Sequence, residues 1–103
     1  MKRKLFIAIC ERNGWDVSED GSELMIHQFS PAGEDFSFHV SNECDPMEVY
    51  RYAEDFDAEE HCEMWLEAKK NGVRGVPSLF GLVDDALALQ SMLDDLARDL
   101  LVA

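Results

Sequence analysis

The sequence predicts one α+β domain over residues 1–103, with an N-terminal helix, a three-stranded antiparallel β-meander and then three helices. Two changes of hydrophobic period support this class, since the period falls from 3.6 residues to 2 after Gly14 and returns to 3.6 after Glu43. The third observation is an apolar stripe at helical spacing in the last quarter of the chain: Leu79, Leu82, Ala86, Leu89, Leu93, Leu96 and Leu100. We expect this long C-terminal helix to pack on the sheet.

Residues 2–13 are predicted to form the first helix. Its apolar face is expected to carry Leu5, Phe6 and Ile9. Asn13-Gly14 supplies a left-handed stop, after which Trp15 can fold back on the last turn. The basic and apolar residues that open the chain imitate a secretory signal, but the apolar run of residues 5–10 is shorter than the about 7–15 residues that a signal requires. We therefore expect no signal peptide.

Three strands are predicted between Trp15 and Val40. Trp15 and Val17 alternate with polar residues, and Asp20-Gly21 is a hairpin signal. Residues 24–29 form the second strand, and residues 30–34 form a loop that contains a proline and a glycine. In the third strand one face is aromatic and aliphatic and the other polar, because Phe36, Phe38 and Val40 alternate with Asp35, Ser37 and His39.

Two helices are predicted over residues 45–56 and 57–71. Each begins with an acidic N-cap, Asp45 followed by Pro46 in the first and Asp57 in the second. Their inner sides are expected to carry Val49, Tyr52, Ala53, Phe56, His61, Met64, Trp65 and Ala68.

The closing helix is expected to follow a stop at Asn71-Gly72 and a short connector, with Ser78 as its N-cap. At 1.5 Å per residue a helix over residues 78–101 spans about 36 Å, whereas six-residue strands span about 20 Å. The sheet alone cannot cover this helix. The two preceding helices, or a second copy of the chain, must cover the rest.

Composition limits the classes of function. The formal net charge of −13 disfavours direct binding to nucleic acid or to an anionic membrane and favours a basic protein partner. Cys10, Cys44 and Cys62 are odd in number and lack C-x-x-C spacing, which indicates reduced thiols in a cytoplasmic protein. No stretch approaches the about 20 apolar residues of a membrane-spanning helix.

The acidic residues are concentrated after the third strand. Ten of them fall between Glu43 and Glu67, where Arg51 is the one basic residue, and Asp84, Asp85, Asp94 and Asp95 add more. Such a face is either a solvated surface with helix caps or a docking surface for a basic partner. The candidate interaction surface comprises Glu34, Asp35, Ser37, His39, Glu54, Asp55, Glu59 and Glu63. An alternative is a DNA mimic that inhibits a restriction enzyme or another nucleic-acid enzyme, because carboxylates can imitate phosphate spacing.

The leucine stripe also allows a structural homodimer through the C-terminal helix. The flanking positions carry no complementary charges, and further apolar residues widen the face beyond a narrow seam: Phe80, Val83, Leu87 and Met92. This pattern favours an ordinary core helix, and a monomer over a homodimer.

The sequence contains no arrangement typical of an enzyme or of a metal site. His39, Cys44, His61 and Cys62 are types that bind zinc, but no two of them have metal-site spacing. There is no nucleophile elbow and no glycine-rich phosphate loop. We therefore expect a non-enzymatic protein without catalytic residues, metal or cofactor.

Two long strings are similar to a known group of proteins. SPAGEDFSF at residues 30–38 resembles a motif of small acidic proteins of Firmicutes and of their phages and conjugative elements. YAEDFDAEEHCEMWLEAKKNGVRGVPS at residues 52–78 resembles a second signature of that group, as do VDDA at 83–86 and LDDLA at 93–97. The resemblance extends over nearly the whole chain from Trp15 and implies no activity. The association with mobile elements implies a host-interaction or anti-defence role.

Overall fold

The computed structural model describes the backbone of residues 1–70, 72 and 79–103, and the side chains of residues 1–68, 72 and 81–103. In chain order the elements are α1 (Arg3–Arg12), β1 (Asp16–Asp20), β2 (Glu23–Phe29), β3 (Asp35–Ser41), α2 (Pro46–Asp55), α3 (Ala58–Lys70) and α4 (Leu79–Val102). This order confirms the predicted α+β class. The predicted cap Ser78 and the predicted stop residue Asn71 lie outside the described residues.

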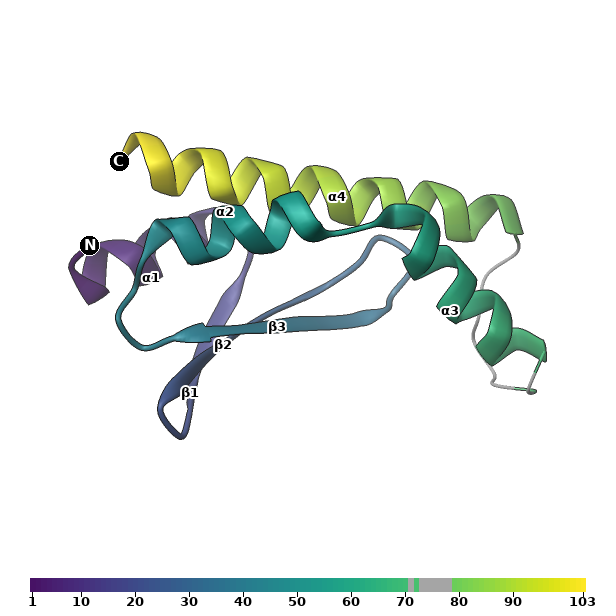
Figure 1. Ribbon diagram of the computed structural model, residues 1–103, viewed down its shortest axis with the longest axis horizontal. Coiled ribbons are helices and arrows are strands. Elements are labelled where there is room, and N and C mark those ends of the chain that lie inside the picture. Colours follow the sequence, from purple (N-terminus) through teal and green to yellow (C-terminus); the bar gives the residue numbers. More distant parts are fainter. Residues whose placement is uncertain (71, 73–78) are drawn as a thin grey trace.

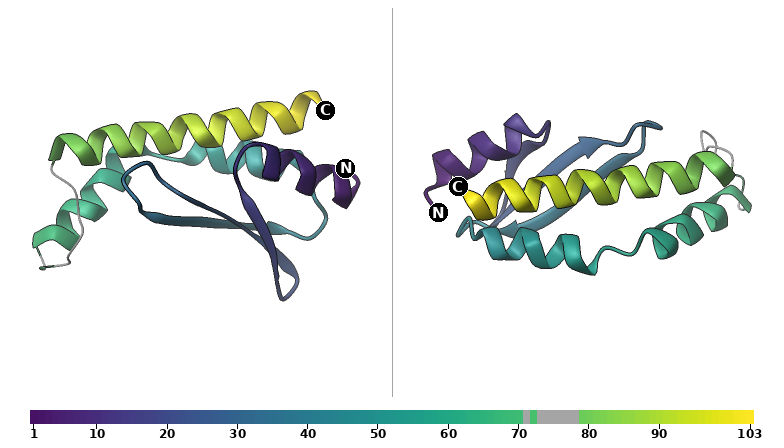
Figure 2. Two further views of the ribbon diagram at one scale, coloured as in Figure 1. Left: turned by 180° about the vertical axis from the view of Figure 1, so that it is seen from behind. Right: turned by 90° about the horizontal axis from the view of Figure 1, so that it is seen from above.

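Helix α4 runs along the molecule, which measures 43 × 27 × 21 Å. In the ribbon diagram it lies above the sheet, and both termini are at the same end (Figure 1). Seen from above, α1 lies on one side of α4 and α2 and α3 follow its other side (Figure 2). The prediction that two helices help to cover α4 is confirmed. Gln90 Nε2 of α4 donates a hydrogen bond to the carbonyl oxygen of Ala53 in α2 at 3.1 Å. Cys62 Sγ of α3 donates a hydrogen bond to the carbonyl oxygen of Leu82 in α4 at 3.4 Å.

The sheet is an antiparallel meander in the order β1-β2-β3. Asp20 pairs with Glu23 around a two-residue turn, and Ile26 pairs with Phe38 on the neighbouring strand. This register places on one face the buried side chains Leu24, Ile26, Phe36, Phe38 and Val40. The opposite face exposes Ser37 and His39, so the predicted alternation in the third strand is confirmed.

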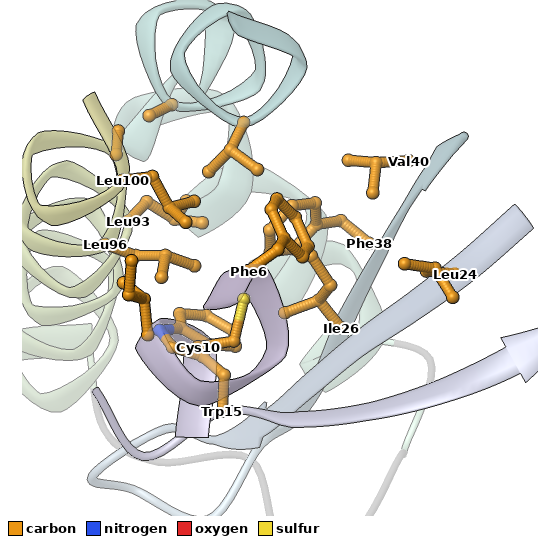
Figure 3. Close-up of a cluster of buried hydrophobic side chains, with 14 of the residues drawn as sticks. Phe6, Cys10, Trp15, Leu24, Ile26, Phe38, Val40, Leu93, Leu96 and Leu100 are labelled. Atoms are coloured by element: carbon orange, nitrogen blue, oxygen red, sulfur yellow. The ribbon is translucent and has the colours of Figure 1, made fainter. Parts of the chain in front are cut away.

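The core lies between this sheet face, α1, α2 and α4 (Figure 3). Six residues of the stripe on α4 are at most 4% exposed: Leu82, Ala86, Leu89, Leu93, Leu96 and Leu100. The side chain of Leu79 lies outside the described ones. Trp15 packs edge-on against Phe38, with ring centroids 5.6 Å apart. The stripe is therefore covered by the chain's own elements.

The end of α1 follows its prediction. The Trp15 amide donates to the Cys10 carbonyl oxygen at 2.9 Å, and Gly14 has a φ of +84°. A Cβ on Gly14 would also lie 2.6 Å from Oε1 of Gln28. The left-handed backbone therefore favours glycine there, and a Cβ would also require the flexible end of the Gln28 side chain to move.

Both acidic N-caps are present. Asp45 Oδ1 accepts from the Met47 amide at 2.9 Å, and Asp57 Oδ1 accepts from the amides of Glu59 and Glu60 at 3.0 and 3.1 Å. The structure adds a contact that the sequence did not indicate. Glu48 in the first turn of α2 accepts from the Ser41 amide at 2.9 Å, which joins the start of α2 to the end of β3.

Four apolar side chains differ from expectation. Leu5 and Met64 were predicted to face inward but are exposed, Met64 by 63%. Val83 and Leu87, which seemed to widen the buried face of α4, are also exposed, Leu87 by 55%. Val83 and Leu87 line a hollow with Ala58, Glu59 and Cys62 of α3, so α3 lies beside them without covering them fully.

Candidate functional site

The candidate site lies where α2 ends and α3 begins. The backbone of Phe56 leaves the helical region with a ψ of 124°, and Asp57 then caps α3. The break directs α3 away from the line of α2, as the ribbon shows (Figure 1).

A hollow of about 360 Å³ opens at this break. It is lined by Phe36 of β3 and by residues of α2, the break and α3: Tyr52, Asp55, Phe56, Asp57, Glu60, His61 and Met64. The Phe56 ring stands almost perpendicular to Phe36, with centroids 6.0 Å apart, and its centroid lies 5.4 Å from that of His61. The hollow thus combines an aromatic floor with a rim of three carboxylates. We call it the aromatic hollow.

The floor is held in place by neighbouring contacts. Tyr52 stacks on Phe38 with centroids 4.4 Å apart and an interplanar angle of 12°. Burial raises the pKa of Tyr52 above its ordinary value, so its hydroxyl stays neutral at physiological pH. His61 Nε2 lies 2.8 Å from Glu34 Oε2, and both side chains are mostly shielded from solvent. This pair joins the loop before β3 to α3 and positions the imidazole beside Phe56.

The rim has no cationic partner among the described side chains. Over all described side chains, the ion pairs between an arginine and a carboxylate join Arg3 to Glu19, Arg12 to Asp99 and Arg98 to Asp95. None of these involves a carboxylate between Glu54 and Glu63.

The predicted interaction residues of β3 lie on the solvent face of the sheet. Asp35 is exposed and pairs with His27 on β2. His39 Nε2 lies 2.9 Å from Asp20 Oδ2, and Ser37 is exposed between them. These residues are therefore on the opposite side of the sheet from the core.

The predicted interaction residues of α2 and α3 are all exposed but lie around different hollows. Asp55 lines the aromatic hollow. Glu54 lines a hollow of about 480 Å³ between α2 and the end of α4. Glu59 lines an apolar hollow of about 250 Å³ that contains Cys62, and Glu63 is exposed on α3. The structure thus divides the eight predicted residues among several surfaces.

Two carboxylates do not project into solvent as the sequence suggested. Glu34 was predicted to belong to the candidate interaction surface, yet its side chain is only 12% exposed because it pairs with His61. Asp85 was counted with the acidic surface but is buried, and its Oδ1 accepts from the Ala32 amide at 2.8 Å. Both carboxylates fix the loop of residues 30–34 to the helices.

The other chemical groups form no evident site. Within the described part of the chain, no three His, Cys, Asp or Glu side chains gather closely enough to hold a metal ion. Cys10 and Cys44 are buried free thiols, and Cys62 is partly exposed. Among the helices that the structure describes, none is long and apolar enough to cross a membrane.

The aromatic floor was missed as a site at the level of sequence. Tyr52 and Phe56 were interpreted only as core residues of the helix over 45–56. Their spacing of four residues places both rings on one side of the helix, directly before the cap Asp57, and this was the available signal. Comparison with protein-family models, with curated proteins and with solved structures finds no match.

Proposed function

We propose that this protein is a non-enzymatic acidic interaction protein of the cytoplasm that docks a basic protein partner through α2 and α3. The observation that carries the proposal is the aromatic hollow, which is lined by the exposed residues Asp55, Asp57 and Glu60; none of these carboxylates forms an ion pair with a described Lys or Arg side chain. A solvated surface needs only charge, whereas here the charge surrounds an aromatic hollow.

The other two hypotheses receive less support. The leucine stripe is buried against α2, α3 and the core, so a homodimer could not use it as its seam without opening the protein. A DNA mimic needs carboxylates at duplex-like spacing, and the carboxylates of α2 and α3 line separate hollows.

The test is a capture experiment in lysate of the source organism with three forms of the protein. One variant neutralises α2 and α3 by Glu54→Gln, Asp55→Asn, Glu59→Gln and Glu63→Gln. The matched control neutralises the same number and type of exposed acids elsewhere, by Glu11→Gln, Asp16→Asn, Glu23→Gln and Glu43→Gln.

We expect one basic protein to bind the wild type and the control but not the α2–α3 variant. Its binding should weaken as the Debye length falls from about 10 Å at 0.1 M salt to about 3 Å at 1 M. Equal capture by all three forms would contradict the proposal. Release of the captured protein by duplex DNA would instead favour the DNA mimic.

A further inference from the structure

We propose, resting on the proposed function, that the aromatic hollow receives an arginine side chain of the basic partner. The hollow has the two components that a guanidinium group needs. Its floor is formed by the rings of Phe36, Tyr52, Phe56 and His61, and its rim by the carboxylates of Asp55, Asp57 and Glu60.

The ring faces of the floor can attract a cation. Cations are attracted to the face of an aromatic ring within about 6 Å of its centroid. The rings of Phe36, Phe56 and His61 have centroids 5.4 to 6.0 Å apart and are mutually tilted by 46° to 87°. A planar group entering the hollow therefore meets ring faces and edges from different directions.

The rim supplies the charge complementarity. The side-chain carboxylates of Asp55 and Glu60 are exposed and make no hydrogen bond or ion pair with any described residue. Asp57 already accepts two amides of α3 through Oδ1, so its position is fixed by the helix start. A cation in the hollow would lie among three carboxylates whose mutual repulsion it would relieve.

Arginine suits this site better than lysine. A guanidinium group stacks on aromatic faces and donates from five N–H groups in one plane, so it can contact the floor and two rim carboxylates together. An ammonium group is compact and more strongly hydrated. Met64, 63% exposed at the edge of the hollow, adds an adaptable thioether wall for the aliphatic part of the side chain.

The test is an amide chemical-shift titration of the isotope-labelled protein with N-acetyl-arginine amide. We expect saturable shifts confined to the residues around the aromatic hollow. N-acetyl-lysine amide should bind at least about 3-fold more weakly, in line with the modest energy of cation–π contacts, and the neutral N-acetyl-citrulline amide should give no saturable shift. Equal shifts from the citrulline probe, or shifts that do not saturate, would overturn the proposal.

Two variants separate the floor from the rim. Asp55→Asn with Glu60→Gln changes only exposed side chains and should weaken arginine binding at least about 5-fold, whereas Glu23→Gln with Glu43→Gln should leave it unchanged. Phe56→Leu keeps the charge and removes a ring, and should weaken binding to a similar degree. If Phe56→Leu unfolds, the variant Asp55→Asn with Glu60→Gln tests the proposal alone. An unchanged affinity of that variant for arginine would overturn the proposal.

The outcomes distinguish this inference from the function on which it rests. Loss of partner capture in the α2–α3 variant without saturable arginine binding would reject the arginine site and leave the docking function standing. Arginine binding in the hollow with equal partner capture by every variant would reject the docking function through this surface.

Discussion

The two ends of α4 are packed differently. Toward the C-terminus, α4 lies against α1, α2 and the sheet, and side chains such as Leu89, Leu93 and Leu96 are fully buried there. Toward its start it lies against α3, whose described residues include none that is fully buried. At that end Leu87 and Met64 are exposed and the hollows around Phe56 and Cys62 open.

This difference separates the part of the protein that stabilises the fold from the part that the proposed docking function would use. The well-packed end supplies most of the apolar burial that holds the fold together. The α3 end carries the aromatic hollow, whose three carboxylates have no Lys or Arg partner among the described side chains, and a neighbouring hollow lined by residues that include Glu34, His61 and Met64. Regions with few buried contacts open at low free-energy cost, so this end can adapt to a partner without unfolding the core.

The largest expected effect on stability comes from truncating a buried side chain at the C-terminal, well-packed end of α4. Leu93→Ala removes a fully buried side chain from the core and should lower the free energy of unfolding by about 2–5 kcal/mol. Leu87→Ala is the matched control on the same helix and should change it by less than about 0.5 kcal/mol, since Leu87 is exposed. Urea unfolding followed by circular dichroism measures both. Similar losses for the two variants would contradict the comparison.

The reaction rates of the three cysteine thiols test the same difference between the two ends of α4. Burial, and next the neighbouring Cys44, raises the pKa of Cys10 to about 12, whereas Cys62 is partly exposed on α3 with a pKa raised mainly by burial. At about pH 8, Cys62 should react with a disulfide reagent at least about 100-fold faster than Cys10 or Cys44, which must await an opening of the core. Reaction rates in single-cysteine variants test this. Equal rates would show that the core end opens as readily as the α3 end.

The raised pKa of Cys10 predicts that the stability of the protein depends on pH. The pKa of Cys10 is higher in the folded than in the unfolded protein, so the folded state keeps a proton that the unfolded state releases above about pH 9. Its stabilising contribution is therefore complete below about pH 9 and is lost as pH rises toward about 12. Urea unfolding of the wild type and of Cys10→Ala over this range measures it, and the variant should lose stability less steeply with rising pH.

The sequence predicted the fold well because its signals are local. Changes of period, the stop at Gly14, and the caps Asp45 and Asp57 each depend on residues a few positions apart, and each is present in the structure. The stripe on α4 was also predictable, because burial of a long apolar face is required whatever covers it.

The candidate site was less predictable because it depends on contacts between distant segments. Glu34 and His61 are 27 positions apart, and Ala32 and Asp85 are 53 apart, so nothing local indicated that two acidic side chains would turn inward. The exposure of Met64 depends on the direction that α3 takes after its break. A carboxylate count could identify an acidic protein, but could not say which carboxylates share a hollow.

The smallest expected effect on stability comes from the rim of the aromatic hollow. Asp55→Asn with Glu60→Gln removes two exposed charges that stabilise no described contact, so the free energy of unfolding should change by less than about 0.5 kcal/mol. Two terms oppose each other at low salt: neutralisation relieves repulsion with Asp57, but it removes a negative charge at Glu60 that favours the dipole at the start of α3, and both terms should vanish in 1 M salt. Thermal unfolding at the two salt concentrations measures it. A loss above about 1 kcal/mol would mean that these carboxylates hold the fold, and the division between a packed end and a recognition end would then fail where it matters most.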